Sequence, residues 1–225
     1  IKKICDLVKP THGLITGLSD QHLELFGSLR AIAEAKFELT AAVDEPSMII
    51  ANSDSKPLII DFERRSIAPV WYGLSERAVL EARNSKITAD GLSFTINNTS
   101  FSGTVFGKAA LNNLLGAITM AQNLGMNLEE IAKAIGTLTP VQHTMELKSG
   151  PGSTLLIDDT YNANTEGVVS ALEDLEYTAR SKRILVFSEV IELGEQTEED
   201  HTHIVDAILT HTTHLMLLPS RLQKF

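Results

Sequence analysis

The chain reads Ile157-Asp158-Asp159-Thr160-Tyr161-Asn162-Ala163-Asn164 where a strand-like run gives way to a helix-like one. An apolar run, 153–157, ends in two carboxylates and two amides around an aromatic ring, and a helix-like segment follows near Thr165. Polar groups gathered where a strand passes into a helix mark ligand sites in open α/β sheets. A capped βα turn explains the same residues equally well, because Asp and Asn also favour turns and helix N-caps. The stretch therefore predicts an α/β fold and leaves both readings of its polar residues open.

The composition of the chain excludes several classes of protein. Its 225 residues carry a net charge of −10, with 43% hydrophobic and 21% charged residues, as in ordinary globular domains. The acidic balance argues against a nucleic-acid partner, since phosphate binding requires clustered Lys and Arg. No apolar run approaches the roughly 20 residues of a membrane span, and no signal-peptide pattern occurs. The single cysteine, Cys5, cannot form an internal disulfide, so we expect a cytoplasmic protein.

Strand-like and helix-like runs alternate upstream of the motif, which also favours an α/β fold. The expected strands are 13–16, 48–51, 58–62, 70–72, 92–97 and 101–105. The expected helices are 28–43, 109–123 and one that begins after Asn127, a good N-cap followed by two glutamates.

A second unit begins at the segment 140–152, where Pro and Gly interrupt both periodicities. Beyond it we expect strands at 154–157, 183–187 and 214–218, separated by helices at 168–177 and 198–209. We therefore divide the chain into residues 1–140 and residues 141–225.

His22 and Lys36 are candidate site residues outside the motif. His22 follows a strand, where α/β sites assemble, and Lys36 lies on the next helix. By spacing alone, a loop histidine and a solvated lysine explain them better. Four further histidines have no Cys or paired Glu to complete a metal site, so we expect them to face solvent. They are His201, His203, His211 and His214.

Several motifs taken together resemble those of the Mur ligase family. The stretch 158–164 is similar to the family's Asp-Asp-Ser-Tyr-Asn-Ala-Asn signature. His22, followed by Gly27-Ser28, is similar to its His-x-x-x-x-Gly-Ser pattern, and 35–38 is similar to its Ala-Lys-x-Glu. Asn113 matches the last Asn of a Gly-x-His-Asn-x-x-Asn segment.

Two weaker matches complete the resemblance. Glu192-Leu193-Gly194 and the downstream His201 are similar to a C-terminal motif of the family. Asn52-Ser53-Asp54 is similar to an Asn-x-Asp motif but is equally well explained as a simple turn. The resemblance implies an α/β chain with the later part of a P-loop-type central ATPase domain (1–140), followed by the first half of a Rossmann-like C-terminal domain (141–225).

The resemblance also implies a role for each matched residue. His22 and Lys36 are the implied catalytic residues and Mg²⁺ ligands, with Lys36 carbamylated. A desolvated lysine loses part of its preference for the charged form, and a carbamate supplies the oxygen ligands that Mg²⁺ prefers. Asn113 and Asp159 are the implied contacts to ATP. The implied substrate-binding residues are Tyr161, Asn162, Asn164, Glu192 and His201.

Within the family, the motif is most similar to that of the members that add D-alanyl-D-alanine to UDP-N-acetylmuramoyl-tripeptide. The implied function is ATP-dependent amide-bond formation through an acyl phosphate, in the synthesis of peptidoglycan precursors. The implied partners are the UDP-MurNAc-peptide and D-Ala-D-Ala. A sister ligase that adds another amino acid, or glutamates to folate, would share Lys36 and His22.

The chain also departs from the family pattern. Thr144 stands where the family has an Arg that faces the nucleotide phosphates, and Ala109 and Ala110 stand where His and Asn are expected. No Gly-x-x-x-x-Gly-Lys-Ser/Thr loop occurs in these residues. We therefore expect little or no ligase activity from the isolated chain, and a degenerate, non-catalytic binding module remains an alternative.

Overall fold

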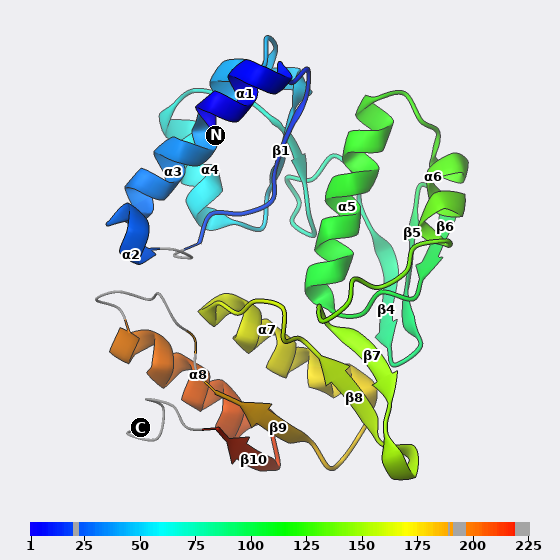
Figure 1. Ribbon diagram of the computed structural model, residues 1–225. Coiled ribbons are helices and arrows are strands. Elements are labelled where there is room, and N and C mark those ends of the chain that lie inside the picture. The colour runs from blue at the N-terminus through cyan, green and yellow to red at the C-terminus, as the bar shows by residue number, and fades with distance from the viewer. Residues whose placement is uncertain (20–22, 189, 191–196, 219–225) are drawn as a thin grey trace.

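The computed structural model describes residues 1–19, 23–188, 190 and 197–218 (Figure 1). Its α-helices and β-strands are α1 (Lys2–Val8), β1 (Gly13–Ile15), α2 (Leu23–Phe26), α3 (Leu29–Phe37), β2 (Ile49–Asn52), α4 (Lys56–Arg64), β3 (Val70–Tyr72), β4 (Arg83–Thr88), β5 (Gly91–Ile96), β6 (Thr99–Gly103), α5 (Lys108–Asn123), α6 (Leu128–Ile135), β7 (Glu146–Ser149), β8 (Leu155–Asp158), α7 (Thr165–Asp174), β9 (Ile184–Phe187), α8 (Thr197–His211) and β10 (His214–Leu217). The mixed α/β class expected from the sequence is confirmed.

A three-stranded parallel sheet, β1-β2-β3, carries the N-terminal part of the fold. Successive side chains of its central strand, β2, point to opposite faces, as strand geometry requires. Ile49 and Ala51 pack into a core with α3 and α4, whereas Ile50 packs into a second core with α5. Because both faces of β2 are buried, its sequence is a continuous apolar run.

Residues 58–62 lie in helix α4, so the prediction of a strand there was wrong. Leu58 and Phe62, four residues apart, are fully buried, whereas Ile60 between them is 64% exposed. Burial of positions i and i+4 is helical periodicity. A short apolar run cannot by itself distinguish strand from helix. Pro57 in the first turn of α4 is the local sign of the helix.

Helix α5 shares one core with the parallel sheet and with an antiparallel sheet, β4-β5-β6 (Figure 1). The hairpin β5–β6 and the helices α5 and α6 confirm the prediction, and Asn127 caps α6 in a capping box. Strand β4 was not expected. Gly116 of α5 lies against the ring of Tyr72, where an added Cβ would be 2.9 Å from Cζ. Only a glycine at residue 116 therefore allows this approach of helix to sheet.

The C-terminal part contains the expected strands and helices in a different pairing. Strands β9 and β10 are parallel partners, whereas β8 pairs in antiparallel fashion with β7. Strand β7 lies inside the segment 140–152, which we had expected to be only a boundary. Helices α7 and α8 pack together around a small core that includes Leu172, Ile204 and Ile208.

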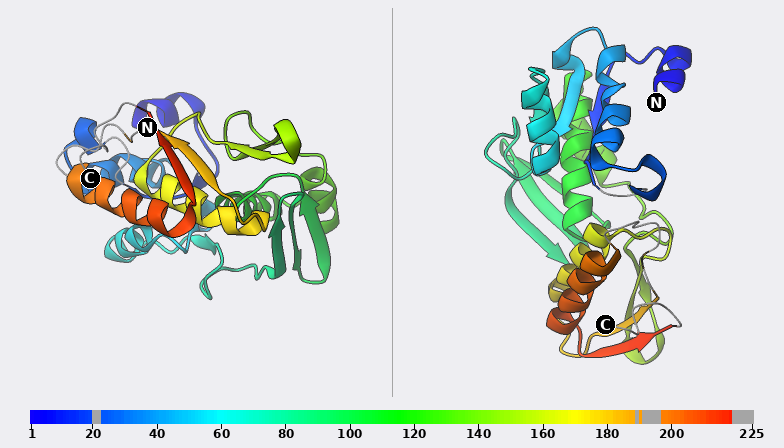
Figure 2. Two further views of the ribbon diagram at one scale, coloured as in Figure 1. Left: turned by 90° about the horizontal axis from the view of Figure 1, so that it is seen from below. Right: turned by 90° about the vertical axis from the view of Figure 1, so that its left-hand side faces the viewer.

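The two parts of the chain meet where α7 passes below the first turn of α5 (Figure 1). The side view in Figure 2 shows α7 and α8 beneath the lower end of α5, with the β7–β8 hairpin beside them. Among the helices that the structure describes, none is long and apolar enough to span a bilayer.

Candidate functional site

A cavity of about 410 Å³ lies at the carboxyl end of β2, beside the first turns of α5. Its wall is built from the turns after β2 and β3, the start of α5, and α7. The lining residues are Asn52, Asp54, Leu74, Lys108, Ala109, Asn112, Asn113 and Ser170. Ligands of open α/β sheets bind at the carboxyl ends of the strands. This cavity is therefore the candidate binding site, and both parts of the chain contribute to it.

Asp54 holds the wall of this cavity together. Its carboxylate accepts hydrogen bonds from the backbone N–H of Leu74 at 2.8 Å and of Ser75 at 2.9 Å, and from the side-chain amide of Asn112 at 2.6 Å. Asn52 accepts from the Asp54 N–H at 2.9 Å and donates to a carbonyl at the end of β1 at 2.9 Å. The run 52–54 is thus a structural turn and a part of the cavity wall at once.

Two neighbouring amides of α5 face this cavity. Asn113 is exposed. Asn112 donates to Asp54, while its oxygen Oδ1 is buried and, within the described part of the chain, has no hydrogen-bond partner. An amide offers a donor and an acceptor side by side, which suits the edge of a nucleobase. The structure therefore places Asn113 in the wall of a cavity, and its contact with adenine stays a prediction.

Lys36 lies on α3, next to the end of β1. Its Nζ donates to the carbonyl of Gly17 at 2.6 Å. Burial lowers the pKa of the Lys36 ammonium, and the negative charge of Glu166 on α7 acts in the opposite direction. A lower pKa raises the fraction of neutral amine, the form that reacts with carbon dioxide. Lys36 is thus a chemically suitable position for a carbamate.

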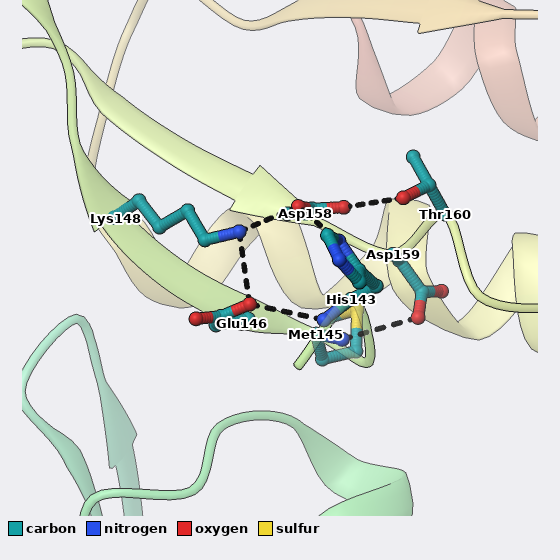
Figure 3. Close-up of polar contacts among 7 residues, drawn as sticks. All are labelled: His143, Met145, Glu146, Lys148, Asp158, Asp159 and Thr160. Atoms are coloured by element: carbon teal, nitrogen blue, oxygen red, sulfur yellow. Dashed lines mark hydrogen bonds and ion pairs between the residues drawn. The ribbon is translucent and has the colours of Figure 1, made fainter. Parts of the chain in front are cut away.

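Asp158 is the centre of a polar cluster at the β7–β8 hairpin (Figure 3). Its carboxylate accepts from Lys148 Nζ and Thr160 Oγ1, both at 2.7 Å, and contacts His143 Nδ1 at 2.8 Å. Lys148 also contacts Glu146 at 2.9 Å. Hydrogen bonds from Lys148, Thr160 and His143 hold the pKa of the Asp158 carboxyl well below its usual range. The first residue of the motif is therefore fixed as a carboxylate by its own hairpin.

The same hairpin presents three possible metal ligands. One ligand atom each from His143, Glu146 and Asp158 lie within 4.8 Å of one another. Lys148 Nζ, however, contacts both carboxylates, at 2.9 Å and 2.7 Å. Its ammonium supplies the positive charge that the carboxylates require, and a metal ion would have to displace it. We therefore describe the cluster as an ion-pair network.

Asp159 and Tyr161 differ sharply in their surroundings. Asp159 is half-buried and accepts from the backbone N–H of Met145 at 3.1 Å, and burial raises the pKa of its carboxyl. Tyr161 is 78% exposed. A nucleotide contact by Asp159 and a substrate contact by Tyr161 both stay predictions.

The two asparagines of the motif make local hydrogen bonds. The side chain of Asn162 accepts from the N–H of Ala163 at 3.0 Å. Asn164 caps α7 and accepts from the N–H of Gly167 at 2.8 Å. The capped turn is thus present in the structure, and it does not use all the hydrogen-bonding capacity of either amide. Substrate contacts by these residues remain predictions.

His201 is buried, so the prediction that it faces solvent was wrong. Its side chain is 1% exposed, and Nε2 lies 3.4 Å from the carbonyl of Val190. It is three residues before Ile204 on α8 and therefore shares the apolar face of that helix. His203 and His214 are exposed, as expected, whereas His211 is half-buried and its Nδ1 lies 3.2 Å from Glu176 Oε1. His201 is absent from the cavity wall, and its substrate contact stays a prediction.

The predicted site residues therefore fall into separate places. Asn113 lines the cavity, Lys36 is within electrostatic range of Glu166, and the motif follows the β7–β8 hairpin. His22 and Glu192 lie outside the described residues. Sequence reasoning missed Ser170, Lys148 and Glu166, because no local pattern marks them: Ser170 lines the cavity, Lys148 contacts Asp158 across the β7–β8 hairpin, and Glu166 acts on Lys36 of a distant helix.

Family models match most of the chain. Residues 2–121 match the Mur ligase middle domain, and residues 143–224 match the Mur ligase, glutamate ligase domain. Among curated relatives, the UDP-N-acetylmuramoyl-tripeptide--D-alanyl-D-alanine ligase of Synechocystis is 30% identical over 91% of this chain and 44% of its own length. The enzyme of the same name from Escherichia coli is 28% identical over 89% of this chain and 46% of its own length.

Solved structures share the fold of this chain. MurF from Acinetobacter baumannii superposes with a TM-score of 0.85 at 20% identity, covering 96% of this chain and 48% of that one. MurF from Thermotoga maritima, solved in complex with ADP, gives a TM-score of 0.82 at 20% identity, covering 96% and 51%. The chain spans about half the length of these relatives. On its matches to both domain models, the chain belongs to the Mur ligase family.

Proposed function

We propose that this chain forms the central and C-terminal parts of an ATP-dependent ligase that joins D-alanyl-D-alanine to UDP-N-acetylmuramoyl-tripeptide. The observation that carries the proposal is the cavity at the carboxyl end of β2, whose wall contains Asn113 from one matched domain and Ser170 from the other. The curated relatives bear the name of this reaction, and one similar solved structure holds ADP. The division of the chain at residues 140 and 141 is part of the proposal.

The reaction has two steps. A substrate carboxylate first takes the γ-phosphoryl group of ATP, which gives an acyl phosphate and ADP. The amine of D-alanyl-D-alanine then attacks the acyl carbon, and inorganic phosphate leaves. Catalysis of such transfers depends on positioning and on stabilising negative charge on the phosphoryl oxygens. In this chain Asn112 and Asn113 would position the base, and α7 would bring the motif 158–164 to the junction.

Lys36 suits the role of a carbamylated magnesium ligand. Its half-buried amine has a lowered pKa, and it lies on α3 beside the carboxyl end of β1. With His22 it would hold Mg²⁺, which would supply positive charge to the phosphates. A Lys36→Arg variant keeps the cation but cannot form a carbamate. In the longest reading frame that contains these residues, we expect it to lower turnover by about 100-fold or more, whereas Lys133→Arg at an exposed position of α6 should leave turnover unchanged.

Nucleotide binding is tested on the 225-residue chain itself by ligand-observed NMR titration. If the cavity holds the base, adenosine should bind about as well as ADP, because the glycine-rich loop that would hold phosphates does not occur in these residues. Asn113→Ala should weaken adenosine binding by about fivefold to tenfold, the value of one polar contact. Asn123→Ala, the same change at the far end of α5, should have no effect. Equal losses in both variants, or no adenosine binding to the unaltered chain, would overturn the assignment.

The reaction itself is tested on the longest reading frame that contains these residues. Phosphate release should require UDP-MurNAc-tripeptide, ATP and D-alanyl-D-alanine together. Phosphate release with a single amino acid in place of D-alanyl-D-alanine, or with folate and glutamate, would instead identify a sister ligase.

The alternative function is a binding module without catalysis. Ala109 lines the cavity where the family pattern has a histidine, and Thr144 replaces an arginine. Neither side chain can supply positive charge to a phosphate. Adenosine binding without phosphate release in the full reading frame would favour this alternative.

A further inference from the structure

The N-terminus of helix α5 is not capped by its own sequence. Gly107 stands at the N-cap position with φ of 99°, and a glycine has no side chain to accept from the first turn. The acceptor comes instead from the other part of the chain. Asp174, the last residue of α7, accepts from the backbone N–H of Lys108 through Oδ2 at 3.0 Å. A carboxylate from the C-terminal part thus occupies the capping position of a helix in the central part.

Asp174 fits this position closely. Its side chain is 1% exposed, and its second oxygen, Oδ1, has no hydrogen-bond partner among the residues that the structure describes. A Cβ built on Gly107 would lie 2.4 Å from Asp174 Oδ2, so a side chain there would displace the carboxylate. The contact therefore requires a glycine on one part and a short side chain with an acceptor oxygen on the other.

Helix α7 links this contact to the candidate site. Lys108, whose amide meets Asp174, also lines the cavity, as does Ser170 one turn earlier on α7. At the opposite end of α7, Glu166 acts electrostatically on Lys36. The position of α7, a ten-residue helix, therefore affects both the cavity, through Ser170, and the surroundings of Lys36, through Glu166.

We propose that Asp174 is a positioning residue, which caps α5 across the domain boundary and so holds α7, the helix that follows the motif 158–164, beside the cavity. The cap itself does not depend on the nucleotide. Its importance for ligation rests on the proposed function.

The negative charge of Asp174 is unfavourable because the side chain is buried. Burial raises the pKa of its carboxyl to about 6, opposed by the hydrogen bond and the positive charge of Lys108 and reinforced by the neighbouring Glu173. The folded-state pKa of Asp174 thus lies above the ordinary value for an aspartate, so burial favours the protonated form. The buried arrangement should therefore become more stable as the pH falls from 7 to 5, because protonation removes the cost of burying the charge. A neutral Asn, which keeps a short acceptor, should retain the contact and lose this pH dependence.

The test is a distance measurement between spin labels on the two parts of the chain, made without nucleotide. Labels are placed at Lys133→Cys on α6 and His203→Cys on α8, both exposed positions, with Cys5→Ser as the background. Asp174→Ala should broaden a narrow distance distribution at least twofold. Asp174→Asn should keep it narrow. Glu173→Ala is the matched control, because it removes the neighbouring exposed carboxylate, which pairs with Lys108 Nζ at 3.1 Å, and should change nothing.

A second measurement distinguishes loss of the cap from general unfolding of the protein. Hydrogen exchange at the Lys108 amide should accelerate at least tenfold in Asp174→Ala, while the amides in the middle of α5 keep their protection. An unchanged distance distribution and unchanged exchange at Lys108 in Asp174→Ala would overturn the proposal. If adenosine fails to bind while Asp174→Ala still broadens the distances, the proposed function falls and the positioning role stands.

Discussion

Two strand-to-helix turns of this molecule have similar residues and opposite surroundings. The first, 52–54, follows β2, and its Asp54 reaches out to three other groups, among them Asn112 of α5. The second, 158–164, follows β8, and its Asp158 is held by residues of its own hairpin and turn. The first turn closes a cavity, whereas the second presents Tyr161, 78% exposed, to solvent.

The difference teaches how one residue composition can serve two purposes. A carboxylate that accepts hydrogen bonds from distant segments, as Asp54 does, holds those segments together, and they can then form one wall of a cavity. A carboxylate satisfied within its own hairpin holds only that hairpin, which leaves the rest of the motif able to meet a partner.

Loss of the Asp54 carboxylate should have the largest effect. Asp54→Ala removes the acceptor for two backbone N–H groups and one side-chain amide, and we expect the free energy of unfolding to fall by about 2–4 kcal/mol. Urea denaturation measures the change. Asp44→Ala, at an exposed carboxylate outside this network, should cost less than about 0.5 kcal/mol. Equal losses of unfolding free energy in the two variants would mean that the Asp54 carboxylate does not hold these segments together.

Asp158 should show its effect mainly in acid. Because the folded-state pKa of Asp158 is lowered from the ordinary value for an aspartate, the ionised carboxylate stabilises the folded protein above about pH 4, and this contribution is lost as the pH falls further. Asp158→Asn should therefore be less stable than the unaltered chain at pH 7 and show a shallower loss of stability between pH 5 and pH 2.5. Urea denaturation across this range measures both slopes, with Asp90→Asn as the exposed control. Parallel pH profiles for the two variants would contradict the role of the cluster.

Tyr161 should contribute least to stability. Because its ring is 78% exposed, Tyr161→Ala should change the free energy of unfolding by less than about 0.5 kcal/mol. In the full reading frame the same substitution should raise the KM for a peptide substrate, since the ring is available for contact. A large loss of stability, or unchanged kinetics, would remove the contrast between the two turns.

The sequence predicted those parts of the fold that local patterns determine. Asn127 followed by Glu130 is a complete capping signal, and α6 begins there. The run 58–62 failed because five apolar-rich residues fit two periodicities, and the tertiary contacts of Leu58 and Phe62 decide between them. The burial of His201 was not predicted, because the spacing of the histidines was compared only with that of metal sites. The apolar face of α8, which includes Ile204 and Ile208, was not considered.

The site was predicted unevenly for a related reason. Asn113 and Lys36 were found through motif resemblance, and the structure shows surroundings suited to both. Asp174 could not be found, because it meets Lys108 across 66 residues of chain and nothing near either residue signals the other.

The contact between Gly116 and Tyr72 has a consequence for the width of the candidate site. Asn112 and Asn113 lie one turn before Gly116 on α5, so the tyrosine ring acts as a spacer that sets how far these amides stand from the end of β2. Even one added methyl group at residue 116 would push the helix outwards and widen the cavity mouth. Gly116, which is not among the residues that line the cavity, thus influences the width of the cavity.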